Sequence, residues 1–478
     1  MRPDRLLAAA TLALAAGGAA AQASAPPRDA LRLVETWLQA QVAYERVPGV
    51  AASIVIGPDV VWRGAFGFAD PARRVPVKPD TVFGICSISK LFTAVAVMQL
   101  VEDGKLALDD DIGKLLPAFA VRRTDPDSGP ISIRSLLTHA SGLPREAAAS
   151  YWTPPDFRFP TREQLLAGLA TQQTLSRANE RHQYSNLGMA LLGEVVATAS
   201  GLPYATYVQQ RILAPLGLAD TRPGGPVGEP GPRMAQGFGA LRRDGTRQAL
   251  PPYDARALAP AAGFSSTAED LARFAAWNFR LRKNGGRELL HVATLREMQR
   301  VHWTDPDGKE TWGLGFAAWR DGGNDMVAHN GTCPGQLSSL QLALTDEVAT
   351  VALINANDNR SASRYTRPMR QLVQKGLKLP APPADGPRLE DYAGSYNEQP
   401  LGSEFVVLPW GRDLAALQLP TPDPAGGLQV LRHVGGDRFR VLRDDGSLGA
   451  EYGFLRDASG RVTGYREWEQ VWLRTAPP

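Results

Sequence analysis

The stretch Gly84–Gly104, GICSISKLFTAVAVMQLVEDG, places a single lysine at the start of a long apolar run. On a helix, apolar side chains such as Leu91, Val95 and Met98 cover almost every face, so we expect a helix that is buried nearly all round. A buried Lys90 needs a partner or must lose its proton, and the dipole of the first helical turn lowers its pKa further. The stretch therefore predicts a buried helix that opens with an amine able to act as a base near neutral pH.

Ser87 precedes Lys90 by three residues, which puts both side chains on one face of the helix. A serine at a helix N-terminus beside a base is an activated nucleophile, and backbone N–H groups there can hold a developing oxyanion. Ser89 has no such partner, because Phe92 stands three residues after it. Taken alone the spacing is a weak signal, since a capping serine followed by a lysine that reaches solvent has the same pattern.

A second motif, Tyr184-Ser185-Asn186, lies just before another apolar helical stretch. A tyrosine oxygen close to Ser87 and Lys90 could relay a proton to a leaving group, and Asn186 could hold both the lysine and a substrate carbonyl. The competing interpretation is a helix-capping asparagine beside a core tyrosine.

A third motif, His329-Asn330-Gly331, stands at the end of a predicted strand. The glycine would let a substrate backbone approach the strand edge closely. The histidine would then lie where charge develops, although a single histidine is more often structural than catalytic.

Together the three motifs resemble the serine β-lactamase and penicillin-binding-protein superfamily, and specifically its class C-like branch. That branch spans class C β-lactamases, D-Ala-D-Ala carboxypeptidases, D-aminopeptidases and bacterial esterases. The order Ser-x-x-Lys, Tyr-x-Asn, Lys/His-x-Gly and the long intervals agree, as do the stretches PGVAASIVI, ISIRSLLTHASGLP, GFSSTAEDLARF and WGLGF. The resemblance covers about residues 31–377, and a weaker one relates the C-terminal part to barrel-like accessory domains.

The resemblance implies a role for each motif residue. Ser87 would attack a carbonyl and form an acyl-enzyme, while Lys90 and Tyr184 share the proton transfers. Asn186 and His329 would position substrate and stabilise charge. Further residues are expected to complete the site: the backbone N–H groups of Ser87 and Thr332 as the oxyanion hole, and Asn330, Gly331, Trp312 and Tyr151 as substrate-binding residues.

The aromatic side chains of the predicted rim have a second interpretation. Tyr151, Trp152 and Phe157 stand in a proline-containing loop, and Trp312 stands near the strand that enters the site. Each could line a substrate cleft, or each could cover the core as loop aromatics commonly do.

Two positions depart from the family pattern. Position 329 is histidine, where class C β-lactamases have lysine. A fixed ammonium suits the carboxylate of a β-lactam, whereas a histidine near its ordinary pKa is a weaker and pH-dependent substitute. We therefore do not expect a strong β-lactamase. Ala178-Asn179 replaces the Pro-Gly that many relatives have before Tyr-x-Asn, which concerns only the shape of that loop.

The chain has two cysteines, Cys86 and Cys333. An even pair in an exported protein is a disulfide candidate, and two buried free thiols are the alternative. The resemblance adds a place for the pair, because in this fold the helix start and the strand end face each other. It implies a Cys86–Cys333 bridge at motif offsets like those of some class A carbapenemases, which requires Cα atoms within about 7 Å.

The fold class that we expect is α+β. Strand-like stretches VAASIVI and VVWRGAFGF stand near the start, QLSSLQLALT and VATVALINA stand much later, and residues 109–280 between them are mostly helical. This order predicts one antiparallel sheet built from both ends, flanked by helices and a helical lobe, as in the β-lactamase/transpeptidase-like fold. We expect a hydrolase domain over 24–379, a Pro-rich linker over 380–388 and a small all-β, barrel-like domain over 389–478.

The N-terminus has the pattern of a secretory signal peptide, predicted over residues 1–23. Arg2 and Arg5 precede an apolar run and a small-residue region, with cleavage expected after Ala21 or Ala23. The apolar run is too short for a membrane anchor. The formal charge of the 478-residue chain is only +3 and its basic residues are scattered, which argues against a nucleic-acid partner.

These observations predict an exported, periplasmic or secreted serine hydrolase that acts on D-Ala-D-Ala or related D-peptide substrates as a carboxypeptidase or endopeptidase. An esterase or weak β-lactamase is the alternative, and a non-catalytic penicillin-sensing protein is a remote one. We expect no cofactor and no metal, because the six histidines show no i,i+4 ligand pairs. The partner would be a small molecule or peptide, and the oligomeric state stays open.

Overall fold

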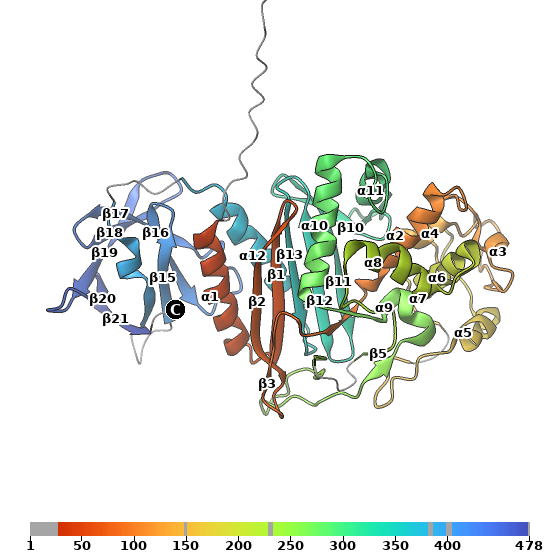
Figure 1. Ribbon diagram of the computed structural model, residues 1–478, viewed down its shortest axis with the longest axis horizontal. Helices are drawn as coiled ribbons and strands as arrows, with labels where there is room; N and C mark the ends of the chain where they lie inside the picture. Colours follow the sequence, from red (N-terminus) through yellow and green to blue (C-terminus); the bar gives the residue numbers. More distant parts are fainter. Residues whose placement is uncertain (1–26, 148–150, 228–232, 381–385, 398–403, 477–478) are drawn as a thin grey trace, which may run out of the picture.

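The computed structural model describes residues 27–147, 151–227, 233–380, 386–397 and 404–476 (Figure 1). The predicted signal peptide and much of the predicted linker lie outside the described residues.

A large antiparallel sheet forms the centre of the hydrolase part. Within the described residues it has nine strands in the order β3-β2-β1-β13-β12-β11-β10-β9-β8. The N-terminal and C-terminal strands meet where β1 pairs with β13, so the predicted sheet built from both ends is confirmed. Its strands are β1 (Gly49–Ile56), β2 (Asp59–Asp70), β3 (Val75–Pro76), β8 (Trp303–Thr304), β9 (Thr311–Trp312), β10 (Ala317–Asp321), β11 (Asn324–Cys333), β12 (Gln336–Ala343) and β13 (Val348–Ile354).

Helices cover both faces of this sheet, which explains why β12 and β13 are buried at every residue. One face packs against α1 (Arg28–Tyr44) and α12 (Ser363–Gly376). The other face packs against α10 (Ala268–Asn284), beyond which the helical lobe lies (Figure 1). Side chains alternate between the faces, so Val50 and Ala52 of β1 join the α1 and α12 core while Ala51 and Val55 join the core of the lobe.

The helix predicted from the opening stretch, α2 (Ser89–Glu102), lies in the middle of the lobe and is buried from Ser89 to Leu100, as expected. It packs against α6 (Asn186–Ser200) and α9 (Ala259–Ala262). The remaining elements of the lobe and its surroundings are α3 (Ile112–Leu115), α4 (Ile133–Leu137), α5 (Arg162–Gly168), α7 (Tyr204–Val208), α8 (Ala214–Leu216), α11 (Val292–Gln299), short 3₁₀ turns at Leu169–Thr171 and Arg256–Leu258, a π-turn at Gln209–Leu213, and the small strands β4 (Phe83–Cys86), β5 (Pro226–Val227), β6 (Tyr253–Asp254) and β7 (Phe264–Ser266).

The C-terminal part forms a closed antiparallel barrel, as the alternating strands predicted. An aromatic core that includes Tyr396, Phe405 and Tyr465 fills its interior. After a short 3₁₀ turn at Leu389–Tyr392, the strands are β14 (Gly394–Asn397), β15 (Glu404–Trp410), β16 (Asp413–Leu419), β17 (Gln429–Gly435), β18 (Arg438–Leu442), β19 (Leu448–Arg456), β20 (Val462–Glu467) and β21 (Gln470–Ala476).

The barrel lies against α1, on the side of the sheet away from the helical lobe (Figure 1). Apolar side chains from α1, including Trp37, and from the barrel, including Val406 and Leu408, share one buried cluster. The Trp37 indole also donates a hydrogen bond to the carbonyl of Thr421 at 2.9 Å, so the packing has a fixed register.

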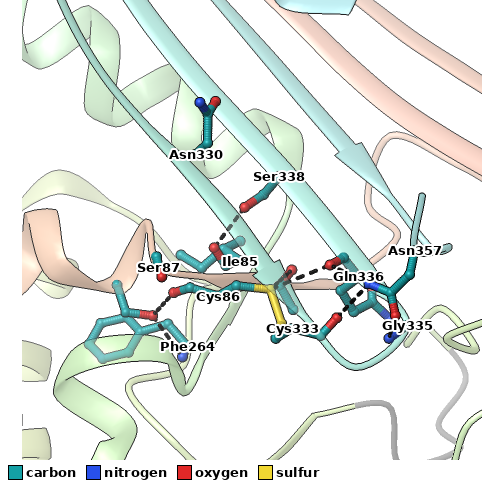
Figure 2. Close-up of a disulfide and its surroundings, with 12 residues drawn as sticks. Ile85, Cys86, Ser87, Phe264, Asn330, Cys333, Gly335, Gln336, Ser338 and Asn357 are labelled. Carbon is teal, nitrogen blue, oxygen red and sulfur yellow. Dashed lines mark hydrogen bonds between the residues drawn. A yellow bond between two sulfur atoms is a disulfide. The ribbon is translucent and has the colours of Figure 1, made fainter. Parts of the chain in front are cut away.

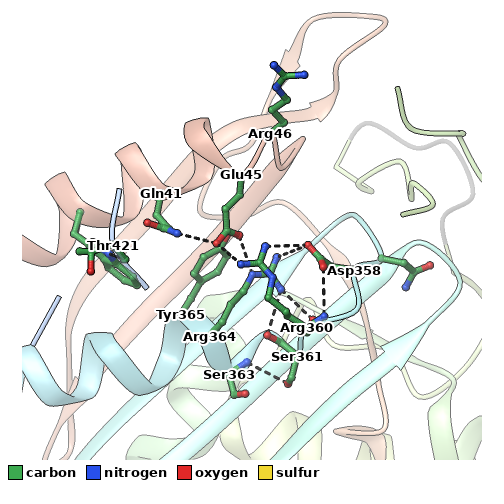
Figure 3. Close-up of polar contacts among 12 residues, drawn as sticks. Gln41, Glu45, Arg46, Asp358, Arg360, Ser361, Ser363, Arg364, Tyr365 and Thr421 are labelled. Carbon is green, nitrogen blue, oxygen red and sulfur yellow. Dashed lines mark hydrogen bonds and ion pairs between the residues drawn. The ribbon is translucent and has the colours of Figure 1, made fainter. Parts of the chain in front are cut away.

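A polar cluster joins α1 to α12. Glu45, directly after α1, forms ion pairs with Arg360 at 2.8 Å and Arg364 at 3.0 Å (Figure 3). The same carboxylate accepts a hydrogen bond from the Tyr365 hydroxyl at 2.7 Å. Glu45 therefore anchors the end of α1 to the beginning of α12.

In the part of the chain that the structure describes, no single helix combines the length and apolar composition needed to cross a bilayer, and one pair bent by 77°, Asn186–Ser200 with Tyr204–Leu216, passes that test by length and composition alone.

Candidate active site

Ser87 lies in the tight turn between β4 and α2. Cys86, just before it, has φ 51°, a left-handed conformation that is uncommon for a residue with a side chain. The Ser87 side chain is half-buried, while Lys90, in the first turn of α2, is fully buried. The Lys90 Nζ lies 3.0 Å from the Ser87 Oγ, so the predicted pair is in direct contact.

Two further acceptors surround the Lys90 amine. The Asn186 Oδ1 lies 2.8 Å from Nζ and the carbonyl oxygen of Ala261 lies 2.6 Å from it. Burial is the main reason that the pKa of Lys90 lies well below its usual value, and the nearby Arg145 lowers it further, while the Glu146 carboxylate opposes both. In its neutral form, which the lowered pKa favours, the amine has two N–H donors and one lone pair, and these fit two acceptors and one serine hydroxyl.

Tyr184 lies at the same centre. The Lys90 Nζ and the guanidinium carbon of Arg145 each lie 4.9 Å from the centroid of its ring. Burial raises the pKa of Tyr184, and hydrogen bonding to the Ser87 hydroxyl opposes part of that rise. The phenol is therefore neutral and can donate a proton at neutral pH.

His329 approaches from β11 and packs against Trp312, with ring centroids 5.7 Å apart. Its Nδ1 lies 2.7 Å from the carbonyl oxygen of Asn330, which can only accept, so Nδ1 carries the hydrogen. Burial chiefly, and the Lys90 charge next, lower the pKa of His329 to about 3. Treating His329 as a histidine near its ordinary pKa was therefore wrong, because burial above all lowers the pKa and keeps the ring neutral at neutral pH.

One edge of β11, on the side of Ser87, extends beyond the residues that pair with β10. β10 pairs with β11 only as far as Ala328, so among the described residues no strand covers the outer edge of residues 329–333. This open edge is where an extended substrate could pair with the backbone, and Thr332 lies within it.

Gly331 fills a tight contact inside the protein, which the sequence did not indicate. A Cβ added at Gly331 would lie 2.2 Å from the Ser338 Oγ and 2.5 Å from the carbonyl oxygen of Ile85. The protein's own contact between β11 and the turn before Ser87 therefore already requires glycine here, and the contact of Gly331 with a substrate stays a prediction.

Asn330, one residue earlier, does not reach the site. Its side chain points away from Ser87 (Figure 2). Its register partner on β12, Ser339, bonds Thr366 of α12, so both side chains lie on the sheet face opposite the lobe. The prediction of a substrate-binding Asn330 side chain is therefore contradicted by strand alternation.

The predicted Cys86–Cys333 disulfide is present, with Cα atoms 5.6 Å apart (Figure 2). Both cysteines are buried. The bridge ties the residue before Ser87 to the residue after Thr332, across 247 residues of chain. The two backbone N–H groups predicted as the oxyanion hole are therefore next to the same covalent link.

Sequence reasoning missed the loop over residues 139–146, which holds the Tyr-Ser-Asn motif in place. His139 stacks on Tyr184 with centroids 4.2 Å apart. The stretch THASGLP belongs to the family resemblance, but the left-handed backbone of His139, with φ 56°, is not visible in a sequence. The loop contacts are Gln183 N to His139 O at 2.7 Å, Ser185 N to His139 Nδ1 at 3.2 Å, Ser185 Oγ to Pro144 O at 2.7 Å, Asn186 N to Arg145 O at 2.7 Å and Asn186 Nδ2 to Glu146 Oε1 at 2.7 Å.

The predicted rim aromatics divide into two groups. Trp312 is at the site, packed against His139 with centroids 4.8 Å apart and against His329. Tyr151 is only 1% exposed and packs on Phe159, so it cannot line a cleft directly. Its hydroxyl donates to Glu146 instead. Phe157 is also buried, in agreement with the alternative of loop aromatics that cover the core.

Histidines gather around Trp312, but they do not form a metal centre. His139, His182 and His329 all pack against its ring. Across the described ranges, no three His, Cys, Asp or Glu side chains are arranged to hold a metal ion. The arrangement instead has the parts of an acyl-transfer site: a half-buried hydroxyl, a buried amine with a lowered pKa, a neutral phenol and an open strand edge.

Comparison with known proteins agrees with this geometry. The sequence model of the family described as Beta-lactamase matches residues 34–374. The chain belongs to the Beta-lactamase family. The match spans the sheet, the lobe and all three motifs, and it ends before the barrel of this Beta-lactamase family protein.

Relatives of this family member include named hydrolases. The chain is similar to the D-alanyl-D-alanine-carboxypeptidase/endopeptidase AmpH of Escherichia coli, with 33% identity over 202 residues, which are 42% of this chain and 52% of that protein. It is also similar to Esterase EstB of Burkholderia gladioli, with 34% identity over 184 residues, which are 37% of this chain and 47% of the esterase. The chain thus spans about half the length of these relatives.

A solved structure extends the likeness of the Beta-lactamase family fold to nearly the whole chain. The octameric penicillin-binding protein homologue from Pyrococcus abyssi superimposes with a TM-score of 0.61 and covers 93% of this chain and 99% of its own. The identity is 22%, so this comparison concerns the fold alone.

Proposed function

We propose that the protein is an exported serine hydrolase that forms an acyl-enzyme on Ser87 and acts on D-Ala-D-Ala or related D-peptides. The observation that carries the proposal is the contact between Ser87 and the fully buried amine of Lys90 at 3.0 Å. Support for the substrate class comes from the likeness to a D-alanyl-D-alanine-carboxypeptidase/endopeptidase.

The proposed reaction begins with proton transfer from the Ser87 Oγ to the lone pair of neutral Lys90. The oxygen attacks the substrate carbonyl carbon, and the backbone N–H groups of Ser87 and Thr332 hold the oxyanion that forms. The C–N bond then breaks, and the leaving amine takes a proton from Tyr184, which is reprotonated from Lys90. Water hydrolyses the ester on Ser87 and releases the acid.

The neutral ring of His329 bears on substrate choice. With a pKa of about 3, it supplies no fixed positive charge at neutral pH for a substrate carboxylate, whether that of a β-lactam or the C-terminal one of D-Ala-D-Ala, so the D-peptide proposal is supported by the likeness to AmpH and not by this residue. A short ester carries no such carboxylate and needs no cation, so an esterase activity is the second candidate, in line with the likeness to Esterase EstB. Strong β-lactamase activity is not expected.

Substrate profiling tests this proposal. Purified protein is assayed with a D-Ala-D-Ala peptide, a chromogenic cephalosporin and short-chain p-nitrophenyl esters, beside the Ser87→Ala variant. We expect turnover of the peptide, slow or no turnover of the cephalosporin, and loss of every activity in Ser87→Ala. Stable labelling of Ser87 by penicillin without turnover would favour a penicillin-sensing protein, and activity that survives in Ser87→Ala would end the serine mechanism.

Export is a separate part of the proposal. The basic, apolar and small-residue regions of residues 1–23 support it. The mature protein would then carry the hydrolase domain over 24–379 and the β domain over 389–478, joined by the linker at 380–388. N-terminal sequencing of protein recovered outside the cytoplasm should show cleavage after Ala21 or Ala23, and recovery of the uncut chain in the cytoplasm would contradict it.

A further inference from the structure

Glu146 stands behind the catalytic centre and has no part in the reaction described above. Its Oε1 accepts a hydrogen bond from the Asn186 Nδ2 at 2.7 Å. Its other carboxylate oxygen accepts a hydrogen bond from the Tyr151 hydroxyl, and Arg145 forms an ion pair with it at 3.2 Å. The side chain is 23% exposed, so the carboxylate is partly withdrawn from water and held by three neighbours.

The carboxylate decides which way the Asn186 amide faces. An ionised carboxylate can only accept hydrogen bonds, so the amide must present its NH₂ group to Glu146. The amide oxygen then has to face the opposite way, toward Lys90, whose Nζ lies 2.8 Å from it. A neutral partner at position 146 would not impose this direction, because a side-chain amide offers both a donor and an acceptor.

The direction of the amide in turn decides where the lone pair of Lys90 lies. The Ala261 carbonyl, 2.6 Å from Nζ, also only accepts. The two N–H bonds of the neutral amine are therefore used by Asn186 and Ala261, and the lone pair is left for Ser87 at 3.0 Å. If the amide turned round, its NH₂ group would occupy the lone pair, and Lys90 would donate to Ser87 instead of accepting its proton.

We propose that Glu146 is a positioning residue, which holds the Asn186 amide in the one orientation that points the free electron pair of Lys90 at the nucleophile. The proposal rests on the proposed function and deepens it. Tyr151 then has a role different from substrate binding: its hydroxyl keeps the Glu146 carboxylate in place from the far side.

The charge of Glu146 adds a second, independent effect on Lys90. Its negative charge favours the ammonium form, against burial and Arg145, so its removal would lower the pKa of Lys90 further. The rate rises with pH as the neutral amine forms, and this acid limb of the pH profile would then move to lower pH. The titratable and charged groups that face Lys90 are Arg145 and Glu146 from the loop, His139 at the loop's start, Tyr184 before α6 and His329 from β11.

Charge and polarity can be separated with substitutions at position 146. E146Q keeps the shape and removes the charge, and we expect a fall in kcat of about two- to tenfold with little change in KM, because the amide is no longer locked. E146K places a donor where the acceptor stood and turns the amide round, so kcat should fall by about 100-fold or more. Tyr151→Phe should cost only a few-fold, since Glu146 still holds Asn186.

The pH profile distinguishes positioning from packing. In E146Q the acid limb of kcat/KM should move to lower pH while its plateau falls, whereas a loss of packing lowers the rate equally at every pH. Glu163→Gln, which replaces an exposed glutamate on α5, is the matched control. It should change neither the position of the acid limb nor the plateau value of kcat/KM. Melting temperatures identify any variant that fails to fold. If E146K does not fold, the pH profile of E146Q tests the proposal by itself.

The labelling rate of Ser87 by a fluorophosphonate separates this proposal from the proposed function. It depends on the same base but needs no natural substrate, so it can be followed even if no peptide or ester is turned over. Loss of labelling in Ser87→Ala establishes the nucleophile. The role of Glu146 would be overturned if E146K labelled as fast as E146Q, or if E146Q labelled as fast as the wild type with an unshifted acid limb.

Discussion

Replacement of Lys90 by methionine is expected to lower kcat/KM by about a thousandfold or more, because it removes the base that activates Ser87. Methionine is unbranched, of similar length and apolar, so it suits a site in which the side chain is 0% exposed. The variant should therefore fold and should still bind substrate. Steady-state kinetics with the best substrate, and the rate of fluorophosphonate labelling, measure the loss.

The matched control for this variant is Lys105→Met. Lys105 is exposed at the end of the same helical region and has no contact with the site, so its removal should leave kcat/KM within twofold of wild type. Activity of Lys90→Met close to wild type, in a folded protein, would show that another group takes the serine proton.

The pH dependence of rate and stability follows from the same residue, and both rise with pH. The neutral amine is the active form, so kcat/KM should rise as pH passes upward through the lowered pKa of Lys90. Between that pKa and the ordinary value of 10.5, the unfolded chain holds one proton more at this residue than the folded chain, so the free energy of unfolding also rises with pH. Lys90→Met should lose both slopes. His329 makes a contribution of its own to stability: its pKa is about 3 in the folded protein against an ordinary 6.5, so it adds a rise in the free energy of unfolding between those pH values, which Lys90→Met should keep.

Removal of the disulfide should give the largest loss of stability. The double variant Cys86→Ala/Cys333→Ala is expected to lower the free energy of unfolding by about 2–5 kcal/mol, because the bridge closes a long loop in the unfolded chain. The bridged residues are 247 apart in the sequence, which places the expected loss toward the upper end. Denaturant unfolding followed by tryptophan fluorescence measures the change.

The control for the disulfide is the reductant itself. Under strong reduction during unfolding, the wild type should become as unstable as the double variant, while the variant should not change. Equal stability of wild type and variant without reductant would show that the bridge adds nothing to the folded protein.

The parts of the fold that depend on local patterns could be predicted from the sequence. The all-apolar run after Ser87 indicated a buried helix, and strand stretches at both ends indicated one sheet, because burial and side-chain periodicity are local properties. The Cys86–Cys333 pair was predicted through the family resemblance rather than from the residues alone, and the structure contains it.

The predictions that were wrong or missing concern properties that depend on neighbours brought together by folding. The neutrality of His329 comes from burial beside Lys90, which no sequence pattern records. The outward direction of Asn330 follows from its register against Ser339, and the hydrogen bond from Tyr151 to Glu146 corresponds to no local sequence pattern. Glu146 itself gave no signal, since a single glutamate two residues after Pro144 has no characteristic spacing.

The pairing of β1 with β13 has a consequence for a chain made from its N-terminus onward. The strand that carries the last motif pairs with β12, and β12 needs β13 to reach β1. A nascent chain that has been made past Ser87 and Lys90, but not yet past residues 348–354, therefore has no assembled catalytic centre. The sheet that places β11 beside the nucleophile is still incomplete. Hydrolysis can therefore begin only after β13 has been made and has paired with β1, which comes late in synthesis but before the barrel is complete.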